Sequence, residues 1–199
     1  MPNIHRNIAT LFGIKGGDSL PYNGAPWKMD TSRATLAELM KLMGFKTGAE
    51  IGVETGRYSR LLLDTIPELK LYCVDPWLAY NRNSQAREDG LYEKTKARLA
   101  GKNADILRMT SLEASKRIPD NSLDFVYIDA LHDFDNAISD IILWVPKVKS
   151  GGIISGHDYV NYYQFGVVQA VNAYTAAHGI VPWYVTTYER EYPSWFWVR

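Results

Sequence analysis

The sequence predicts one α/β domain in which a mostly parallel sheet carries helices on both faces. Three observations support this fold class. Short apolar segments alternate with segments of helical periodicity over five successive units, an order typical of a doubly wound sheet. The first apolar segment enters its helix through a glycine turn. The chain has 199 residues, of which 46% are hydrophobic, enough for one domain with a substantial core.

The strands are predicted from apolar runs that end in polar or glycine-containing turns. The first lies over residues 49–53, where Ala49, Ile51 and Val53 are compact and apolar. The last two are separated by a hairpin-length turn, which places one antiparallel strand at an edge of a Rossmann-like sheet of seven strands. The other predicted strands cover residues 69–74, 104–109, 123–128, 152–155, 181–187 and 194–198.

The helices are predicted from apolar residues that recur on one face. The segment 31–43 places Leu36, Leu39 and Met40 on one side, and Gly44 ends the pattern. The polar segment 81–100 ends in a helix that carries apolar residues at helical spacing. The other predicted helices cover residues 57–65, 111–117, 135–145 and 165–178.

Residues 1–30 differ from the rest of the chain, because glycine and proline interrupt them repeatedly and little periodicity remains. We interpret them as a loop-rich N-terminal arm, with one short helix near residues 8–12. The arm either covers a ligand cleft as a lid or packs on the outside of the domain. Residues 31–199 form the domain itself.

The charge balance excludes several classes of partner. Lys and Arg total 22, as do Asp and Glu, so no overall field attracts nucleic acid or an anionic membrane. No apolar run approaches the roughly 18 residues of a membrane span, and the N-terminus lacks the plan of a secretory signal. The single cysteine, Cys73, suits a reducing compartment. We therefore expect a cytoplasmic protein.

The glycine turn indicates the kind of ligand. Gly52 and Gly56 permit backbone conformations that a side chain would block, and helix starts offer free N–H groups. A dinucleotide fingerprint needs a second glycine where this chain has Glu54, which would repel a diphosphate. An acid at this place suits a ligand with an ammonium, a sulfonium and ribose hydroxyls. S-adenosylmethionine (SAM) fits that description, and the alternative is an ordinary strand–turn–helix corner.

Polar residues follow the end of every parallel strand, where ligands of open α/β sheets bind. Asp75 is placed to accept the ribose hydroxyls or, alternatively, to cap a turn before proline. Trp77 either stacks on adenine or belongs to the core, and Ser111 either bonds the adenine edge or caps its helix. The predicted cofactor-binding residues are Glu50, Gly52, Glu54, Thr55, Gly56, Asp75, Trp77, Ser111 and Asp129.

Asp129, His132, His157 and Asp158 follow the fourth and fifth predicted strands and carry the most chemistry. Two carboxylates from neighbouring strand ends suit Mg²⁺, and His157 as a third ligand would favour a softer ion such as Mn²⁺. His132 can serve as a general base, because imidazole titrates near neutral pH. The alternative for each histidine alone is a hydrogen-bonded structural side chain.

With these residues in place, the chain resembles the class I SAM-dependent methyltransferases. Glu50-Ile-Gly-Val-Glu-Thr-Gly-Arg-Tyr-Ser59 is similar to their first motif as it occurs in catechol-type O-methyltransferases. Tyr127-Ile-Asp-Ala-Leu-His-Asp133 and Lys149-Ser-Gly-Gly-Ile-Ile-Ser-Gly-His-Asp-Tyr159 resemble the methyltransferase-24 type, a group similar to macrolide-sugar O-methyltransferases and cephalosporin hydroxylase proteins. The resemblance covers residues 45–199.

The resemblance implies Mg²⁺ on Asp129 and on the pair His157-Asp158, and a histidine base at His132. His157 departs from the family pattern, which usually has a carboxylate there. We therefore expect an O-methyltransferase for a small-molecule hydroxyl, sugar or phenol-like, with SAM and either Mg²⁺ or Mn²⁺.

Two other functions stay open at this stage. A nicotinamide-dependent oxidoreductase would use the Tyr-x-x-x-Lys string at residues 92–96, although that string follows the wrong strand. A non-catalytic SAM-fold module would bind a partner through the aromatic C-terminal edge, which could also be covered in a homodimer. The aromatic residues concerned are Trp183, Tyr184, Tyr192, Trp195 and Trp197.

Overall fold

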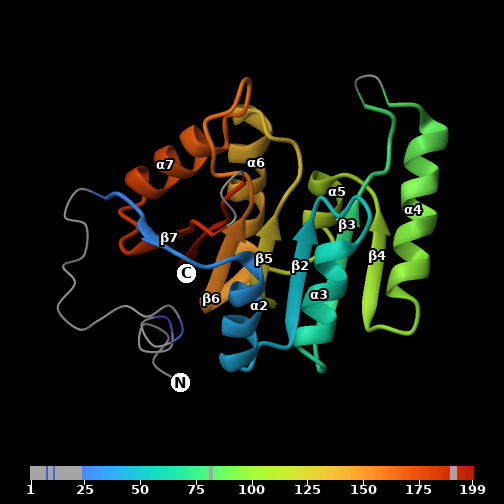
Figure 1. Ribbon diagram of the computed structural model, residues 1–199, viewed down its shortest axis with the longest axis horizontal. Helices are drawn as coiled ribbons and strands as arrows, with labels where there is room; N and C mark the ends of the chain where they lie inside the picture. Colours follow the sequence, from blue (N-terminus) through green and yellow to red (C-terminus); the bar gives the residue numbers. More distant parts are fainter. Residues whose placement is uncertain (1–7, 9–10, 12–23, 81–82, 189–191) are drawn as a thin grey trace.

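The protein is a three-layer α/β domain (Figure 1). The computed structural model describes residues 8, 11, 24–80, 83–188 and 192–199. The strands are β1 (Trp27–Met29), β2 (Thr47–Ile51), β3 (Lys70–Asp75), β4 (Ala104–Arg108), β5 (Leu123–Ile128), β6 (Val148–Gly156), β7 (Trp183–Thr186) and β8 (Trp195–Val198). The helices are α2 (Arg33–Leu42), α3 (Arg57–Thr65), α4 (Gln85–Leu99), α5 (Ser111–Ser115), α6 (Phe134–Trp144) and α7 (Val167–Ala177), with a short 3-10 helix η1 (Val145–Lys147).

The strands form one sheet in the order β1-β7-β8-β6-β5-β2-β3-β4. All neighbouring strands are parallel except at β8, which runs antiparallel to both β6 and β7. The predicted fold class is therefore confirmed, with eight strands instead of seven. The antiparallel strand β8 lies third from its edge, because β7 and β1 pair beyond it.

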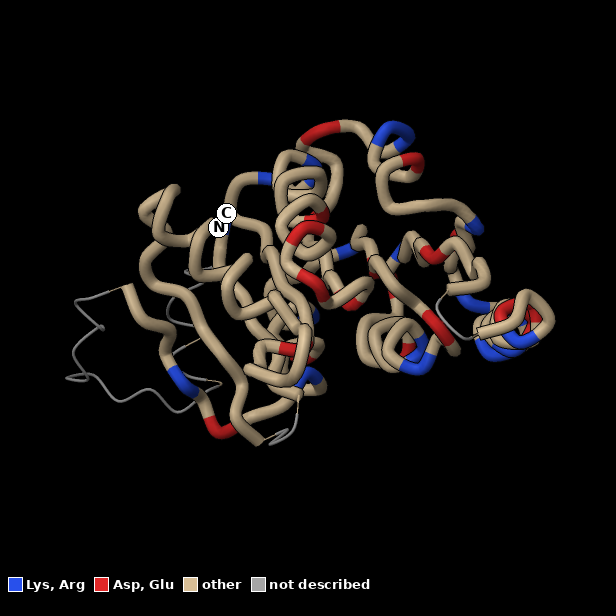
Figure 2. Tube along the Cα trace, turned by 90° about the horizontal axis from the view of Figure 1, so that it is seen from above, with Lys and Arg blue, Asp and Glu red and all other residues tan. Residues whose placement is uncertain are grey.

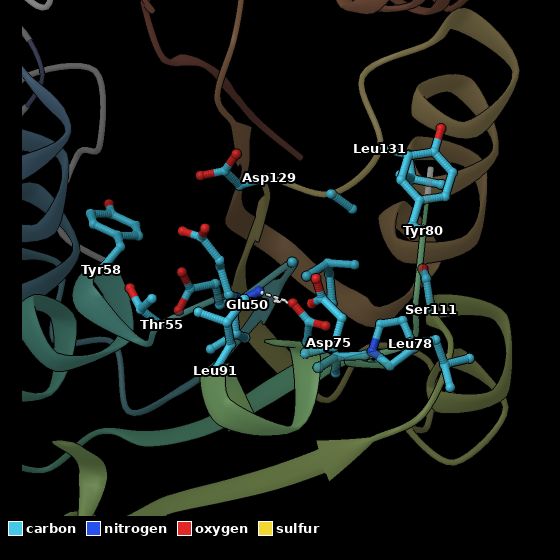
Figure 3. Close-up of a pocket in the computed structure, with 18 of the residues that line it drawn as sticks. Glu50, Thr55, Tyr58, Asp75, Leu78, Tyr80, Leu91, Ser111, Asp129 and Leu131 are labelled. Atoms are coloured by element: carbon cyan, nitrogen blue, oxygen red, sulfur yellow. Dashed lines mark hydrogen bonds between the residues drawn. The ribbon is translucent and has the colours of Figure 1, made fainter. Parts of the chain in front are cut away.

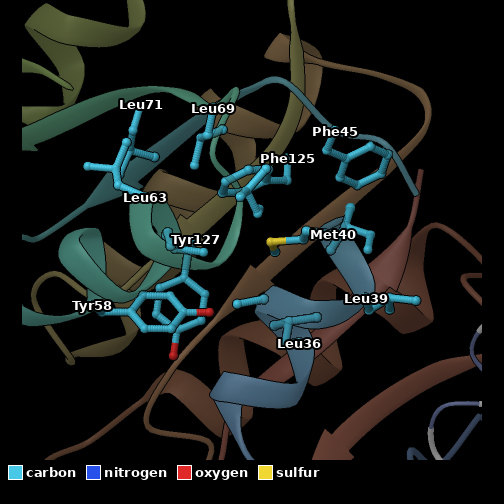
Figure 4. Packing of buried hydrophobic residues seen from close by; sticks show 14 of the residues in the cluster. Leu36, Leu39, Met40, Phe45, Tyr58, Leu63, Leu69, Leu71, Phe125 and Tyr127 are labelled. Atoms are coloured by element: carbon cyan, nitrogen blue, oxygen red, sulfur yellow. The ribbon is translucent and has the colours of Figure 1, made fainter. Parts of the chain in front are cut away.

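The two faces of the sheet are covered by different helices. Buried side chains of α2, α3 and α4 pack on one face, and those of α5, α6 and α7 pack on the other. Figure 4 shows the first core, in which Leu36 and Met40 of α2 and Tyr58 of α3 surround Phe125 and Tyr127 of β5. The Tyr58 and Tyr127 ring centres are 4.2 Å apart. This packing fixes α2 and α3 beside the central strands, where the site lies.

Side chains cap several helices at their N-termini. Ser32 accepts a hydrogen bond from the backbone of α2, Ser84 from α4 and Asp133 from α6. Thr110 forms a reciprocal capping box with Glu113 at the start of α5. These caps satisfy N–H groups that a helix start otherwise leaves unpaired, so the turns before the helices are well defined.

The predicted N-terminal arm is only partly described. Residues 24–30 contain strand β1, which pairs in parallel with β7 and was not predicted, since three residues carry no readable periodicity. Ile8 and Leu11 are helical, and Ile8 is buried in the first core. The rest of the predicted helix and the glycine-rich part of the arm lie outside the described residues.

Acidic and basic residues are interspersed along the chain, and Figure 2 shows no large region of a single sign. This agrees with the balanced composition. Among the described residues, no helix combines the length and the apolar character needed to cross a lipid bilayer.

Candidate active site

A cavity of about 850 Å³ opens at the carboxyl ends of the central strands (Figure 3). Its lining comes mainly from the segments after β2, β3 and β5, with additions from α2 and α4. Strands β3 and β4 extend from β2 in one direction, while β5 and β6 extend in the other. The cavity therefore lies at the point where the strand order reverses, which is where open α/β sheets bind ligands.

The glycine turn after β2 forms the floor of this cavity. Gly52 has a φ of +86°, and a Cβ at this position would lie 2.0 Å from the carbonyl oxygen of Asp129. Gly56 has a φ of +69° and is the N-cap residue of α3. Position 52 therefore requires glycine for two reasons. The backbone is left-handed there, and the segment after β5 lies too close for a side chain.

Asp75 holds this turn in place. One oxygen of its carboxylate accepts hydrogen bonds from the backbone N–H groups of Val53 (3.0 Å) and Glu54 (2.9 Å). The other oxygen accepts from the N–H of Trp77 at 2.8 Å. Asp75 lines the cavity, as predicted for a ribose-binding acid, and it also fixes the local turn. The two interpretations that the sequence left open are thus compatible.

Trp77 belongs to the core. Its side chain is 1% exposed, it does not line the cavity, and its indole N–H donates to the carbonyl oxygen of Glu54 at 2.8 Å. Its ring packs against Tyr92, with the ring centres 5.0 Å apart. The predicted stacking of Trp77 on adenine is therefore wrong, and its alternative, a place in the core, is confirmed. The apolar side chains that line the cavity after β3 include Leu78 and Tyr80.

Glu50 and Glu54, both predicted to bind the cofactor, line the cavity but differ in burial. The Glu54 side chain is 69% exposed and lies 4.0 Å from Arg87 of α4. Glu50, inside β2, is 2% exposed and points into the cavity beside Asp129 (Figure 3). Burial raises the pKa of Glu50 to about 8, although a hydrogen bond from the Ser59 hydroxyl opposes this shift. A cationic group inside the cavity would therefore stabilise the ionised form of Glu50.

A second cluster of titratable groups lies where β5 and β6 end. His132 Nε2 is 2.8 Å from an oxygen of Asp158 and 3.9 Å from an oxygen of Asp129. Burial lowers the pKa of His132, but the hydrogen bonds and charges of the two aspartates outweigh this effect and raise it to about 9. Burial likewise raises the pKa of Asp158, and the two nearby histidines reverse this, so that it falls well below its usual range.

The donor atoms of Asp129, His132 and Asp158 all lie within 4.8 Å of one another. Two carboxylates and an imidazole at this spacing can hold a divalent cation. His132, which was predicted as a base, belongs to this cluster, and His157 as a third ligand stays a prediction. His157 Nδ1 lies 3.4 Å from Asp158 and 3.8 Å from Asp129, at the margin of the group.

Ser111 lines the cavity at the end opposite Tyr58 (Figure 3). Its hydroxyl donates to the buried Asp140 and accepts from the indole N–H of Trp144 at 2.8 Å. Burial raises the pKa of Asp140 to about 6, although the hydrogen bond from the Ser111 hydroxyl opposes this shift. The helix cap is Thr110, so the capping role considered for Ser111 is wrong.

Arg33, the first residue of α2, lines the cavity and was missed in the sequence. Its guanidinium lies 5.2 Å from the centre of the Tyr58 ring, and Nη1 is 3.7 Å from an oxygen of Asp129. The Tyr58 hydroxyl donates to the Arg33 carbonyl at 3.1 Å. One feature of the sequence could have identified Arg33. It is a cation at the start of a helix, where the helix dipole favours an acid.

The features behind the two alternative functions do not form sites. Lys96 pairs with Glu93 and lies 5.2 Å from the Tyr92 ring centre, and neither Tyr92 nor Lys96 lines the cavity. Trp183, Trp195 and Trp197 are each 1% exposed. The aromatic side chains of β7 and β8 therefore belong to the core, whereas Tyr192, in the turn before β8, is 40% exposed.

Fold and site together define a Rossmann-like α/β domain with a ligand cavity at its switch point. The Methyltransf_24 family model, described as a methyltransferase domain, matches residues 49–159, more than half of the chain. The chain belongs to this family of methyltransferases. Arg33 lies outside the matched region, whereas Glu50, Asp75, Asp129, His132 and Asp158 lie inside it.

Several solved structures share the fold. An O-methyltransferase from Bacillus cereus in complex with SAH superposes with a TM-score of 0.59 at 15% identity, covering 98% of this chain and 90% of that one. TomG from Streptomyces achromogenes, an O-methyltransferase involved in tomaymycin synthesis and bound to SAM, gives 0.60 at 14% identity, covering 100% and 90%. Cofactor-bound Rv0187 from MTB gives 0.60 at 16% identity, covering 98% and 90%. No curated protein shows a significant sequence match.

Proposed function

We propose that the protein transfers a methyl group from SAM to a hydroxyl group of a small molecule. The observation that carries this proposal is the convergence, in one cavity, of a cofactor-type glycine turn and a cluster of acid–base groups. The cavity of about 850 Å³ is within the range of cofactor sites. Family membership and the likeness to SAM- and SAH-bound O-methyltransferases support the same function.

The two ends of the cavity suit the two ends of SAM. Leu78, Tyr80 and Ser111 form one end, which suits adenine, with Asp75 next to it for the ribose hydroxyls. Glu50 and Asp129 form the other end, which suits the ammonium of the amino-acid part. Gly52 lets the segment after β5 approach this turn closely, which brings Asp129 to the glycine turn.

Methyl transfer is an in-line displacement at an activated carbon, so the protein mainly positions the acceptor and removes its proton. His132 is the proposed base, held by Asp158 at 2.8 Å. Asp129 and Asp158 are the proposed ligands of Mg²⁺ or Mn²⁺, and His157 lies close enough to assist. Bound there, the cation supplies a Lewis acid that orients the acceptor oxygen and lowers the pKa of its hydroxyl.

A methyl-transfer assay tests the proposal. Protein is incubated with SAM labelled in the methyl group, with Mg²⁺ or Mn²⁺, and with panels of phenols and sugars, and labelled products are separated. We expect an O-methylated product from at least one panel, lost in His132→Ala. Binding of SAM without transfer to any hydroxyl, nitrogen or thiol acceptor would favour a non-catalytic module instead.

A further inference from the structure

We propose that Phe165 and Tyr162 bind the methyl acceptor, and that they select an uncharged acceptor with a flat ring. This inference rests on the proposed methyl transfer. It assigns the ring of the acceptor to residues 160–166, which connect β6 to α7 and lie outside the region that the family model matches.

His132, Phe165 and Tyr162 form an aromatic row that begins at the proposed base. The Phe165 ring centre is 4.5 Å from that of His132 and 5.6 Å from that of Tyr162. His132 lines the cavity, Phe165 and Tyr162 do not, and Tyr162 is 59% exposed. Since the proposed cofactor occupies the cavity, the acceptor reaches His132 from outside it. The rest of the acceptor then lies beside Phe165 and Tyr162.

Backbone contacts fix the aromatic row relative to the base. The Gly166 N–H donates to the His132 carbonyl oxygen at 2.7 Å, and the Phe165 N–H donates to the Tyr162 carbonyl oxygen at 2.8 Å. A Cβ at Gly166 would lie 2.3 Å from the backbone nitrogen of Phe134, so glycine lets this segment lie directly against the start of α6. The rings are therefore ordered before an acceptor arrives, which lowers the entropy cost of binding.

The orientation of the two rings suits a flat ligand. The planes of Tyr162 and Phe165 are nearly perpendicular, at 82°. Aromatic rings attract other rings in offset stacks and edge to face, and a perpendicular pair provides both kinds of contact. Packing in the core does not account for Tyr162, because more than half of its surface stays exposed. A phenyl ring and the apolar face of a pyranose both fit this surface, and the test below separates them.

The charges near the aromatic row favour an uncharged acceptor. Residues 160–166 contain no lysine, arginine, aspartate or glutamate. The carboxylates of Asp158 and Asp129 lie 2.8 Å and 3.9 Å from His132, at the inner end of the row. A carboxylate or phosphate on the acceptor would meet these acids and find no cationic side chain in this segment. The row therefore disfavours acceptors that carry phosphate, such as acyl-CoA thioesters and nucleotide-linked sugars.

The test uses two pairs of probes that differ mainly in charge. 3,4-Dihydroxybenzyl alcohol and 3,4-dihydroxybenzoate form the aromatic pair, and methyl glucoside and methyl glucuronide form the sugar pair. Their dissociation constants are measured by NMR titration of protein loaded with SAH, the product that remains when SAM has lost its methyl group. The variants are Tyr162→Ala, Phe165→Leu and the control Tyr163→Ala, a tyrosine of the same segment that is 90% exposed. Calorimetry with SAH and thermal melting verify that each variant is folded.

We expect the neutral member of one pair to bind the wild type and Tyr163→Ala at least roughly 10-fold more tightly than its charged partner. Tyr162→Ala and Phe165→Leu should each weaken binding of that neutral probe by roughly 3- to 10-fold, because each removes one aromatic contact. The dissociation constant of SAH should stay within about twofold in every variant, since neither ring lines the cavity. The pair that binds shows whether the acceptor is aromatic or a sugar.

The outcomes separate this inference from the proposed function. If SAH binds but no neutral probe does, or if charged probes bind as tightly as neutral ones, the inference is overturned while the cofactor site stands. Equal weakening by Tyr163→Ala and Tyr162→Ala also overturns it. If the wild type does not bind SAH, the proposed function and the inference fail together. Should Phe165→Leu melt early, Tyr162→Ala decides, because the Tyr162 side chain is largely exposed.

Discussion

Glu50 is a carboxyl group held inside the central strand at 2% exposure, with a pKa raised to about 8 by burial. Between the ordinary pKa of 4.5 and about 8, the folded protein keeps this proton while the unfolded chain loses it. The folded state then binds more protons, so its stability falls as the pH rises through this window. A cofactor ammonium beside Glu50 would stabilise its ionised form.

Glu50→Gln should therefore gain stability relative to the wild type as the pH rises. The glutamine keeps an acceptor for Ser59 and carries no charge to bury. We expect its advantage to grow by roughly 1–3 kcal/mol between about pH 5 and pH 8.5, measured by urea unfolding, with weaker SAM binding throughout. A difference in the free energy of unfolding that stays constant with pH would contradict the assignment.

His132 is the base in the proposed mechanism. His132→Ala removes the proposed base, so we expect turnover to fall by about 10²- to 10⁴-fold. The SAM dissociation constant should change by less than about threefold, because the proposed role of the histidine is towards the acceptor and not the cofactor. Steady-state kinetics and calorimetry measure the two effects, with His178→Ala as a control outside the cavity. A large loss of SAM binding would instead place His132 in the cofactor site.

The proton on His132 should respond to a divalent cation. Asp129 and Asp158 raise the His132 pKa to about 9, so a cation on these carboxylates displaces that proton. Calorimetry with Mn²⁺ in two buffers of different ionisation enthalpy should show release of about one proton per ion near pH 7.5, and affinity should increase towards pH 9. His132→Gln should abolish the release. Binding without proton release in the wild type would mean that the ion lies elsewhere.

At the scale of elements, the turn between β2 and α3 connects the fold to the site. Gly52→Ala would place a methyl group 2.0 Å from the Asp129 carbonyl oxygen and force the segments after β2 and β5 apart. We expect a loss of more than about 2 kcal/mol in the free energy of unfolding, and loss of SAM binding.

Gly44→Ala is the matched control for this prediction. Gly44 also has a positive φ, +71°, but a Cβ there would meet nothing within 4 Å. Gly44→Ala should lower the free energy of unfolding by about 1 kcal/mol, the cost of the backbone conformation alone, and leave SAM binding intact. Equal costs at both glycines would show that the close approach at Gly52 does not matter.

At the scale of the whole molecule, two sequence features predicted most of what the structure shows: the alternation of strands with helices, and the polar residues that follow the strands. The order of elements, the parallel sheet and the joint position of Asp75, Asp129, His132 and Asp158 follow from topology, which brings parallel strand ends to one edge. Strand β1 could not be predicted, because pairing with β7 defines it and its own three residues do not.

Side-chain direction was the part that the sequence did not determine. Trp77 follows a strand end as a ligand-stacking residue would, yet its ring turns into the core. His157 and His132 follow neighbouring strands, and only coordinates show that His132 is the closer to Asp158. Arg33 reaches the cavity because α2 packs beside α3, a contact between helices that the periodicity of either helix does not predict.

The most direct test of the whole account is calorimetry with SAM and, separately, with NADH, each with and without Mg²⁺. The account predicts micromolar binding of SAM and no binding of NADH. Asp75→Ala should weaken SAM binding strongly, since this residue both faces the ribose position and holds the glycine turn. Binding of NADH with no response to SAM would contradict the central claim that this cavity is a SAM site.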